Sequence, residues 1–217
     1  MARRPRIVIA TRNGGKLREI RAALPASAAM LVGLDEADPH SRIAAPPEDE
    51  PTFAANARAK AAYYARATGL WALADDSGLE VDALNGAPGT RSARYAADAG
   101  DAGAAGRRDA ANNARLLQAL AGVPEAERTA RFICCLALSD GHRTLLEARG
   151  VLEGRIGLSA RGENGFGYDP LFVLPGRRCA VAELTADQKN AISHRGQAVR
   201  AFAKALGGTE GDRPCPR

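Results

Sequence analysis

Residues Arg6–Leu24 read RIVIATRNGGKLREIRAAL and contain three consecutive structural signals. The first part, Arg6–Thr11, is a short apolar run of the kind that forms a buried strand, and Asn13–Gly15 has the residues of a tight turn. In Lys16–Leu24 the apolar residues recur at the three- and four-residue spacing of a helix. The stretch therefore predicts a strand, a glycine turn and a helix, which is a typical opening of an α/β fold.

The next part of the chain continues this alternation. Met30–Leu34 predicts a second strand, and Asp35–Pro51, which is acidic and rich in proline, predicts a loop. Thr52 suits the N-cap of a helix over Phe53–Thr68, and Gly69 suits its end. We then expect two strands, at Leu70–Ala74 and Leu79–Leu84, on either side of the polar segment Asp75–Gly78, and a turn at Asn85–Gly89.

The second half predicts a helix, a hairpin and a long last helix. Arg108–Leu120 has helical spacing, and the strands Arg128–Leu138 and Arg143–Glu153 flank the hairpin signal Asp140-Gly141. Thr185 and Gln188 form a capping box that opens a helix through Leu206. We therefore expect an α/β fold with two lobes around a central mixed sheet. We expect one domain over residues 1–217, with its core at 6–206 and a loose tail at 207–217.

Composition excludes several classes of protein. The 217 residues are 46% hydrophobic and 25% charged, which suffices for a full core. The longest apolar run near the start, Ile7–Ala10, is far too short for a signal-peptide core or a membrane span. The four cysteines lack metal-binding spacing, so we expect a reduced, cytoplasmic protein. The net charge of +5 comes from scattered basic residues, and we expect binding neither to nucleic acid nor to a membrane.

The glycine turn before Lys16 is a candidate phosphate site. Backbone N–H groups at a helix N-terminus favour anions, and Lys16 adds a mobile positive charge. The turn is not a P-loop, which needs glycine six residues before the lysine and serine or threonine after it, because Ala10 and Leu17 occupy those positions. An ordinary strand–helix turn with a surface lysine is the alternative interpretation.

A second candidate site is acidic. Asp75 and Asp76 are adjacent, so their side chains point to opposite faces of an extended chain, and one can enter a cleft while the other braces the loop. Carboxylate oxygens suit Mg²⁺, which usually takes one or two of them together with substrate phosphates. Glu48-Asp49-Glu50 can supply a further ligand. The alternative is an Asx turn with a solvated aspartate pair and a solvated acidic loop.

Two more candidates lie toward the C-terminus. Phe166–Asp169 places two aromatic rings and a carboxylate beside glycines, and such a loop can stack on a nucleobase. Alternatively, the two rings complete the core. Lys189, Ser193, His194 and Arg195 would place four donors on and around one helix, which suits an anionic or oxo-bearing ligand. Here the alternative is an exposed polar face.

Lysine usage favours the functional interpretations. Arginine fills 26 of the 30 basic positions, and three of the four lysines, Lys16, Lys60 and Lys189, fall in candidate segments. A flexible ammonium and a rigid guanidinium are not interchangeable at a phosphate site.

The motifs occur in one order along the chain: Ala10–Leu17, Thr52-Phe53 with Asn56-Ala57 and Lys60-Ala61, Ala74–Leu79, Gly86–Gly89, Ser92–Tyr95, Gly165–Pro170, Ala182–Thr185, Lys189 and Ile192–Gly196. In combination, they resemble the inosine triphosphate pyrophosphatase family, over nearly the whole chain from residue 6 to about 206.

The resemblance implies an elongated fold with a substrate cleft between its lobes, a homodimer, and Mg²⁺-dependent hydrolysis of purine nucleoside triphosphates such as dITP, ITP and XTP to the monophosphate and pyrophosphate. It implies that Asp76 is general base and metal ligand. Glu48 is our choice for the second metal ligand and Glu50 the fallback. It implies substrate binding by Thr11, Arg12, Asn13, Gly14, Gly15, Lys16, Ser77, Phe166, Gly167, Tyr168, Asp169, Lys189, His194 and Arg195. The sequence departs from the family at Arg12 and Asn164, where glycine is usual.

Two alternatives compete with this hypothesis. A Maf-like nucleotide diphosphatase is disfavoured by the His194-Arg195 pair and by the FGYD sequence of the aromatic loop. A nucleic-acid-binding protein is suggested only by the pI near 9.3, and the chain, with 5% aromatic residues, lacks a basic stripe with interleaved aromatics.

Overall fold

The computed structural model describes residues 5–25, 28–100 and 107–208. Within these ranges the strands are β1 Arg6–Ile9, β2 Met30–Gly33, β3 Trp71–Val81, β4 Thr129–Ser139, β5 Thr144–Ile156 and β6 Phe172–Val173. The α-helices are α1 Gly14–Ala23, α2 Leu34–Ala37, α3 Phe53–Thr68, α4 Arg108–Ala119, α5 Ala186–Ile192 and α6 His194–Gly208. Short 3₁₀ turns are η1 Asp82–Leu84, η2 Gly89–Arg94, η3 Ala97–Ala99, η4 Glu125–Glu127 and η5 Val181–Glu183.

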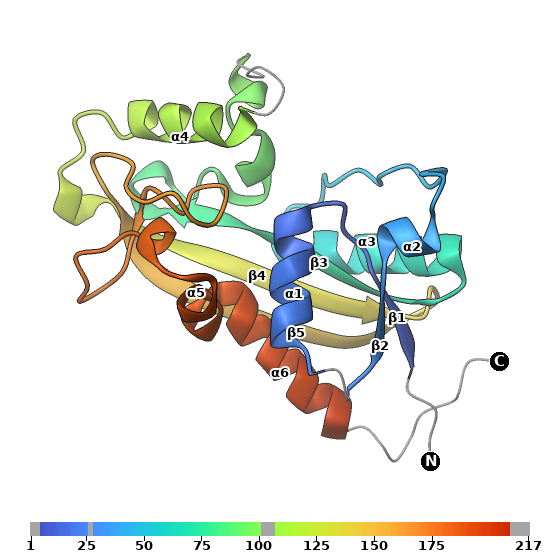
Figure 1. Cartoon of the computed structure of the whole chain (residues 1–217). Coiled ribbons are helices and arrows are strands. Elements are labelled where there is room, and N and C mark those ends of the chain that lie inside the picture. Colours follow the sequence, from blue (N-terminus) through green and yellow to red (C-terminus); the bar gives the residue numbers. More distant parts are fainter. Residues whose placement is uncertain (1–4, 26–27, 101–106, 209–217) are drawn as a thin grey trace. The chain divides into compact units, whose positions relative to one another are not determined.

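The described strands form one mixed sheet in the order β2-β1-β3-β4-β5-β6, of which Figure 1 labels β1 to β5. β1 lies parallel to both β2 and β3, with Ile7 opposite Leu31 on one side and Trp71 on the other. β5 and β6 are antiparallel. The short connection between the neighbouring strands β4 and β5 matches the predicted hairpin. The expected mixed α/β fold is confirmed.

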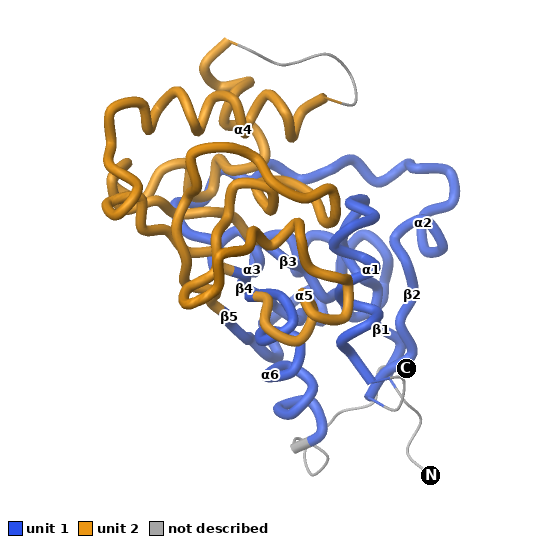
Figure 2. Tube along the Cα trace, turned by 60° about the vertical axis from the view of Figure 1, so that its left-hand side comes forward, with its two compact units in different colours: residues 1–76, 134–150, 194–217 blue, residues 77–133, 151–193 orange. Residues whose placement is uncertain are grey.

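The chain divides into two compact units, which Figure 2 shows in blue and orange. Unit 1 comprises residues 1–76, 134–150 and 194–217, and unit 2 comprises residues 77–133 and 151–193. The single domain over residues 1–217 stays a prediction. Of the expected tail, Gly207 and Gly208 end helix α6, and residues 209–217 lie outside the described residues.

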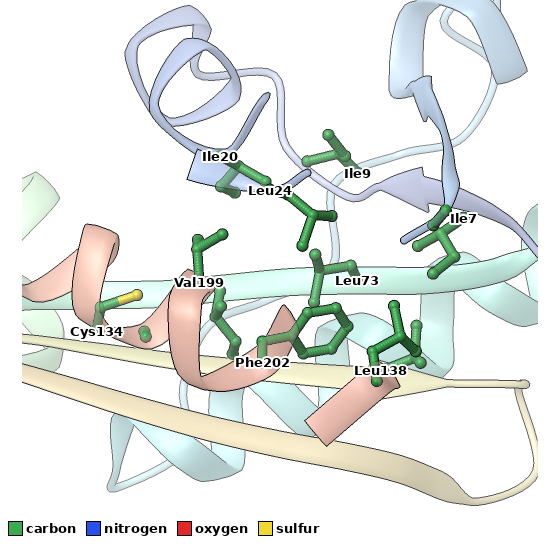
Figure 3. Close-up of a cluster of buried hydrophobic side chains, with 13 residues drawn as sticks. Ile7, Ile9, Ile20, Leu24, Leu73, Cys134, Leu138, Val199 and Phe202 are labelled. Atoms are coloured by element: carbon green, nitrogen blue, oxygen red, sulfur yellow. The ribbon is translucent and has the colours of Figure 1, made fainter. Parts of the chain in front are cut away.

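The core of unit 1 explains why helices α1 and α6 lie where they do. Ile20 of α1 and Val199 and Phe202 of α6 meet the strand residues Ile7 and Leu73 in one buried cluster (Figure 3). Each fully buried side chain of this size contributes about 1.5–3 kcal/mol to stability. The cluster therefore holds both helices against the sheet, and their first turns carry several candidate site residues.

Glycine at one position of β5 lets helix α6 approach the sheet. A Cβ on Gly150 would collide with the carbonyl oxygen of His194 and the amide of Ala198, both in the first turns of α6. Replacement by any other residue would push α6 away from β5, because backbone atoms cannot rotate aside. Gly150 thus sets the depth of the helix that carries His194 and Arg195.

Strand β3 corrects the first half of the sequence interpretation. Two strands were expected on either side of Asp75–Gly78, but Trp71–Val81 is one continuous strand that includes this polar segment. The sequence predicts an interruption of the strand at Asp75–Gly78 because two adjacent aspartates are rare inside a sheet. The break is unnecessary here because cations within unit 1 neutralise the buried charge of Asp75.

The last helix is also different from the prediction. Ser193 has an extended backbone (φ −64°, ψ 153°) and separates α5 from α6 without a glycine or a proline. The expected single helix through Leu206 is therefore wrong, and Lys189 lies on a different helix from His194 and Arg195. A smaller correction is the short helix α2 at the start of the expected loop.

The described cysteines form no disulfide bond. Cys134 and Cys135 are buried, as expected for small apolar residues, Cys179 is half-buried, and all three are free thiols. Cys215 lies outside the described residues. No helix in the described ranges combines the length and the apolar character that crossing a membrane requires.

Candidate functional site

The glycine turn before Lys16 is braced from within. The Oδ1 of Asn13 accepts hydrogen bonds from the amides of Gly15 (2.9 Å) and Lys16 (3.1 Å), so Asn13 is the N-cap of helix α1. The amide of Asn13 in turn donates to the hydroxyl of Thr11 at 3.1 Å. These contacts hold the turn in one shape.

The guanidinium of Arg12 contacts residues outside this turn. It donates to the carboxylate of Asp38 (3.0 Å) and to the carbonyl oxygen of Ile43 (2.9 Å). Arg12 thus ties the turn to the loop after α2. Its predicted contact with substrate stays a prediction.

Asp75 lies at the centre of a buried ion-pair network in unit 1. Its two oxygens contact Lys16 Nζ at 2.5 Å and Arg195 Nε at 2.8 Å. The thiol of Cys134 donates to the same oxygen as Arg195 at 3.1 Å, and Arg195 also pairs with Glu19. Asp75 and Arg195 are only 1% and 2% exposed, so these partners replace the water that both charges lack.

Burial and charge act in opposite directions on Asp75. Burial alone would raise the pKa of its carboxyl, but the charges of Arg195 and Lys16 outweigh burial and hold the pKa well below its usual range. Burial and the neighbouring carboxylate raise the pKa of the Cys134 thiol. Asp75 is therefore a permanent anion that fixes the ammonium of Lys16 and the first turn of α6.

Asp76, on the opposite face of strand β3, has the reverse electrostatics. Burial raises the pKa of Asp76 to about 6, and the charges of Glu48 and Asp75 act in the same direction. Lys16 and a hydrogen bond with Asn56 oppose the rise without cancelling it. A carboxyl with this pKa can exchange a proton near neutral pH, which is what a general base requires.

The acidic loop is held beside Asp76 by helix α3. Asn56 accepts a hydrogen bond from the amide of Glu50 at 3.0 Å and donates to the carbonyl oxygen of the same residue at 3.4 Å. Lys60, one turn further along α3, pairs with Glu48. The two α3 side chains position the backbone and the carboxylate of this loop, and Glu48 is close enough to influence the pKa of Asp76.

These two carboxylates suit Mg²⁺. Two like charges near each other, one of them buried, are relieved by a divalent cation, and Mg²⁺ usually takes one or two protein carboxylates with the rest from water and phosphate. Among the described residues there is no group of three or more His, Cys, Asp or Glu side chains that could hold a metal ion by itself. The donor set therefore fits a metal that arrives with its substrate.

In unit 2, the aromatic loop is built around Asp169. Its Oδ2 accepts the amide of Phe166 at 2.8 Å and pairs with Lys189 Nζ at 2.6 Å. The ammonium of Lys189 also lies 4.5 Å from the centre of the Phe166 ring, a cation–π contact. Gly165 has a φ of +79° and no room for a Cβ, which would collide with the Asp169 carboxylate.

The two aromatic rings of this loop have different environments. Tyr168 is 5% exposed, and its hydroxyl donates to the carbonyl oxygen of Ser92 at 2.8 Å. Burial, with Tyr95 and Asp109, raises the pKa of this phenol, so it stays neutral. Phe166 is only half-buried. The Tyr168 ring therefore completes the core of unit 2, and the Phe166 ring is the more exposed of the two.

Helix α4 supports the same loop from the side. Asp109 accepts the amide of Gly167 at 2.7 Å, and Asn113 donates to the carbonyl oxygen of Gly167 at 3.0 Å. Sequence reasoning assigned no role to either residue. Their four-residue spacing on one helix was the only available signal.

A sequence comparison decides the family. A model of the Ham1 family matches residues 7–205. The chain belongs to the Ham1 family. A relative from Exiguobacterium sibiricum, named dITP/XTP pyrophosphatase, is 46% identical over 203 residues, covering 93% of this chain and 96% of the relative. A protein of the same name from Pseudomonas aeruginosa is 47% identical over 210 residues, which cover 95% of this chain and 100% of the relative.

Solved structures of Ham1 proteins agree with the fold. The HAM1 protein from Coxiella burnetii matches with a TM-score of 0.81 at 39% identity and covers 94% of this chain and 100% of its own. A dITP/XTP pyrophosphatase from Mycobacterium abscessus matches with a TM-score of 0.70 at 40% identity, and the match covers 91% of this chain and 97% of that protein. The resemblance inferred from the sequence motifs is confirmed.

Within this Ham1 chain, Lys16 and Arg195 pair with Asp75, and the charges of Asp75, Lys16 and Glu48 all act on Asp76, so these residues form one network. Ser77 follows Asp76 on β3 and is half-buried, and His194 begins α6 with 5% exposure. Asn56 and Lys60 carried the family motif but had no predicted role. Their spacing of four residues, which places both side chains on one face of α3, was the sequence signal for a shared role.

Proposed function

We propose that this chain hydrolyses purine nucleoside triphosphates such as dITP, ITP and XTP to the monophosphate and pyrophosphate, with Mg²⁺ as cofactor. The names of its Ham1 relatives support the reaction. The observation that carries the proposal is Asp76, a buried carboxyl with a pKa of about 6 beside Lys16 and Glu48. The Asp76 carboxylate can accept a proton, Glu48 beside it can bind the metal, and Lys16 can bind phosphate.

Asp76 would orient the attacking water and accept its proton. The water oxygen forms a bond to the α-phosphorus, the bond from that phosphorus to the bridging oxygen of the β-phosphate breaks, and pyrophosphate leaves with the bridging oxygen. Glu48 and Asp76 would hold Mg²⁺, which supplies neutralisation of the phosphate charge. Asn56 and Lys60 keep the two carboxylates in position.

Lys16 would bind the triphosphate. Its ammonium is held by Asp75 at 2.5 Å, so it needs little reordering when substrate arrives. The N-terminus of α1 adds the favourable end of a helix dipole. Because these groups contact phosphate, they supply affinity without distinguishing one base from another.

The aromatic loop of unit 2 would bind the base. Phe166 offers a stacking face, and Lys189 is held beside it by Asp169. Hypoxanthine and xanthine carry an acceptor oxygen at C6 where adenine carries a donor amino group, and a site built around such a hydrogen bond rejects the wrong group by about 10⁴–10⁵. Contact of His194 and Arg195 with the base stays a prediction, as do the homodimer and the cytoplasmic location.

A substrate panel tests this proposal. Purified protein is given dITP, ITP, XTP, GTP and ATP, with and without Mg²⁺, and pyrophosphate and orthophosphate are measured separately. We expect Mg²⁺-dependent pyrophosphate release with dITP, ITP and XTP far above ATP. Release of orthophosphate alone, or equal use of ATP, would overturn the proposed reaction or its specificity.

A further inference from the structure

A basic pocket lies in unit 2, and none of its lining residues has been assigned a role above. It has a volume of about 300 Å³, and its lining residues are Glu125, Arg155, Gly157, Leu158, Ser159, Arg161, Val173 and Arg178. All of them belong to unit 2. We propose that this pocket is a second anion site that binds a phosphate-chain group, such as pyrophosphate or the diphosphate end of a nucleotide.

The three arginines come from three separately anchored segments. Arg155 lies on β5 directly opposite Val173 of β6, so the sheet register fixes its position. Arg161 donates its amide to the carbonyl oxygen of Pro170 at 2.9 Å. Arg178 sits in a turn that is closed by a β-bridge between Val173 and Ala180. The three backbones are therefore held in place before any ligand arrives.

The positive charge of the pocket is poorly neutralised. Arg155 Nε lies 3.9 Å from the nearest oxygen of Glu125, and Arg161 Nε lies 3.7 Å from Glu183, both beyond hydrogen-bond length. The same oxygen of Glu183 already accepts the amide of Ala180 at 2.5 Å. Among the described residues, Arg178 makes no ion pair. Three guanidinium groups thus retain donors that face one pocket.

A phosphate chain matches this donor set better than other anions. A guanidinium binds two oxygens of a phosphate in parallel, and three such groups suit an anion with several charges and several oxygens. Ser159 adds a hydroxyl group to the lining. Leu158, 61% exposed, and Val173 give the pocket an apolar side, which can receive the carbon part of a nucleotide.

Calorimetry on the full chain tests the proposal. Inorganic pyrophosphate is titrated at low salt, without divalent cations, into the wild type, the pocket variant Arg155→Gln/Arg178→Gln and the control Arg58→Gln/Arg143→Gln. The control removes the same charge from exposed arginines outside the pocket. We expect the wild type and the control to bind one more equivalent than the pocket variant, or to bind at least about tenfold more tightly.

Identical isotherms for all three proteins would overturn the proposal. Equal melting temperatures show that the variants fold, and Arg178→Gln alone serves if the double variant does not fold. A parallel titration with a nucleoside diphosphate identifies the source of the ligand. If the nucleoside diphosphate binds more tightly than pyrophosphate and the pocket variant loses this binding, the ligand is a nucleotide. If it binds equally or more weakly, the ligand is the free anion. The proposal does not depend on the proposed reaction, because none of the lining residues takes part in it.

Discussion

Replacement of Arg195 by methionine separates a positioning role from contact with the base. The guanidinium is 2% exposed and bonds Asp75 and Glu19. Methionine keeps much of the volume but leaves Asp75, which is 1% exposed, with one fewer cation. Removal of one partner of a buried ion pair typically costs about 3–5 kcal/mol. We therefore expect the free energy of unfolding of Arg195→Met to fall by about that amount.

Urea denaturation followed by circular dichroism at pH 7 measures this loss. Arg58→Met is the matched control, because Arg58 pairs with Glu147 where both side chains are 45% exposed, and such a pair contributes at most about 1 kcal/mol. If Arg195 positions Asp75, kcat/KM should fall by a similar factor for dITP and ATP. Unchanged stability together with a selective loss of dITP hydrolysis would refute this reasoning and place Arg195 at the base.

Three further predictions concern the same network. Asp76→Asn should lower kcat by about 10²–10⁴ while the exposed control Asp35→Asn keeps wild-type turnover, and equal kcat values for both would remove Asp76 from catalysis. Lys16→Gln should lower kcat/KM for dITP and XTP equally, unlike the exposed control Lys204→Gln, whereas a changed ratio would move Lys16 from phosphate to base. The pKa of Asp75 is lower in the folded protein than in the unfolded chain, so its ionised form stabilises the fold fully above the unfolded pKa of about 3.9, and this stabilisation is lost as the pH falls from there toward the folded pKa. The free energy of unfolding in urea should therefore drop more steeply in acid for the wild type than for Asp75→Asn. Parallel curves of stability against pH would contradict this.

Local signals in the sequence predict most of the fold. Thr52 and Gly69 bound helix α3 as expected, since a cap and a left-handed residue act within one turn of the helix. The strand–turn–helix at Arg6–Leu24 is likewise confirmed. The break at Ser193 could not be predicted, because it uses neither glycine nor proline and depends on where α6 packs in unit 1.

The site was predictable as a set of residues but not as an arrangement. Asp75 and Asp76 look alike in sequence, and only their partners separate them. Two cations and a thiol make Asp75 a fixed anion, whereas burial raises the pKa of Asp76. In the same way, hydrogen bonding to Ser92 assigns Tyr168 to the core and leaves Phe166 as the more exposed ring. These distinctions depend on contacts between distant parts of the chain.

Isotope labelling tests the proposed reaction most directly. dITP is hydrolysed with Mg²⁺ in water enriched in ¹⁸O, and both products are analysed by mass spectrometry. We expect one ¹⁸O atom in the nucleoside monophosphate and none in pyrophosphate, because water attacks the α-phosphorus. Label in pyrophosphate or in orthophosphate would show attack at another phosphorus and would contradict the roles proposed for Asp76 and Lys16.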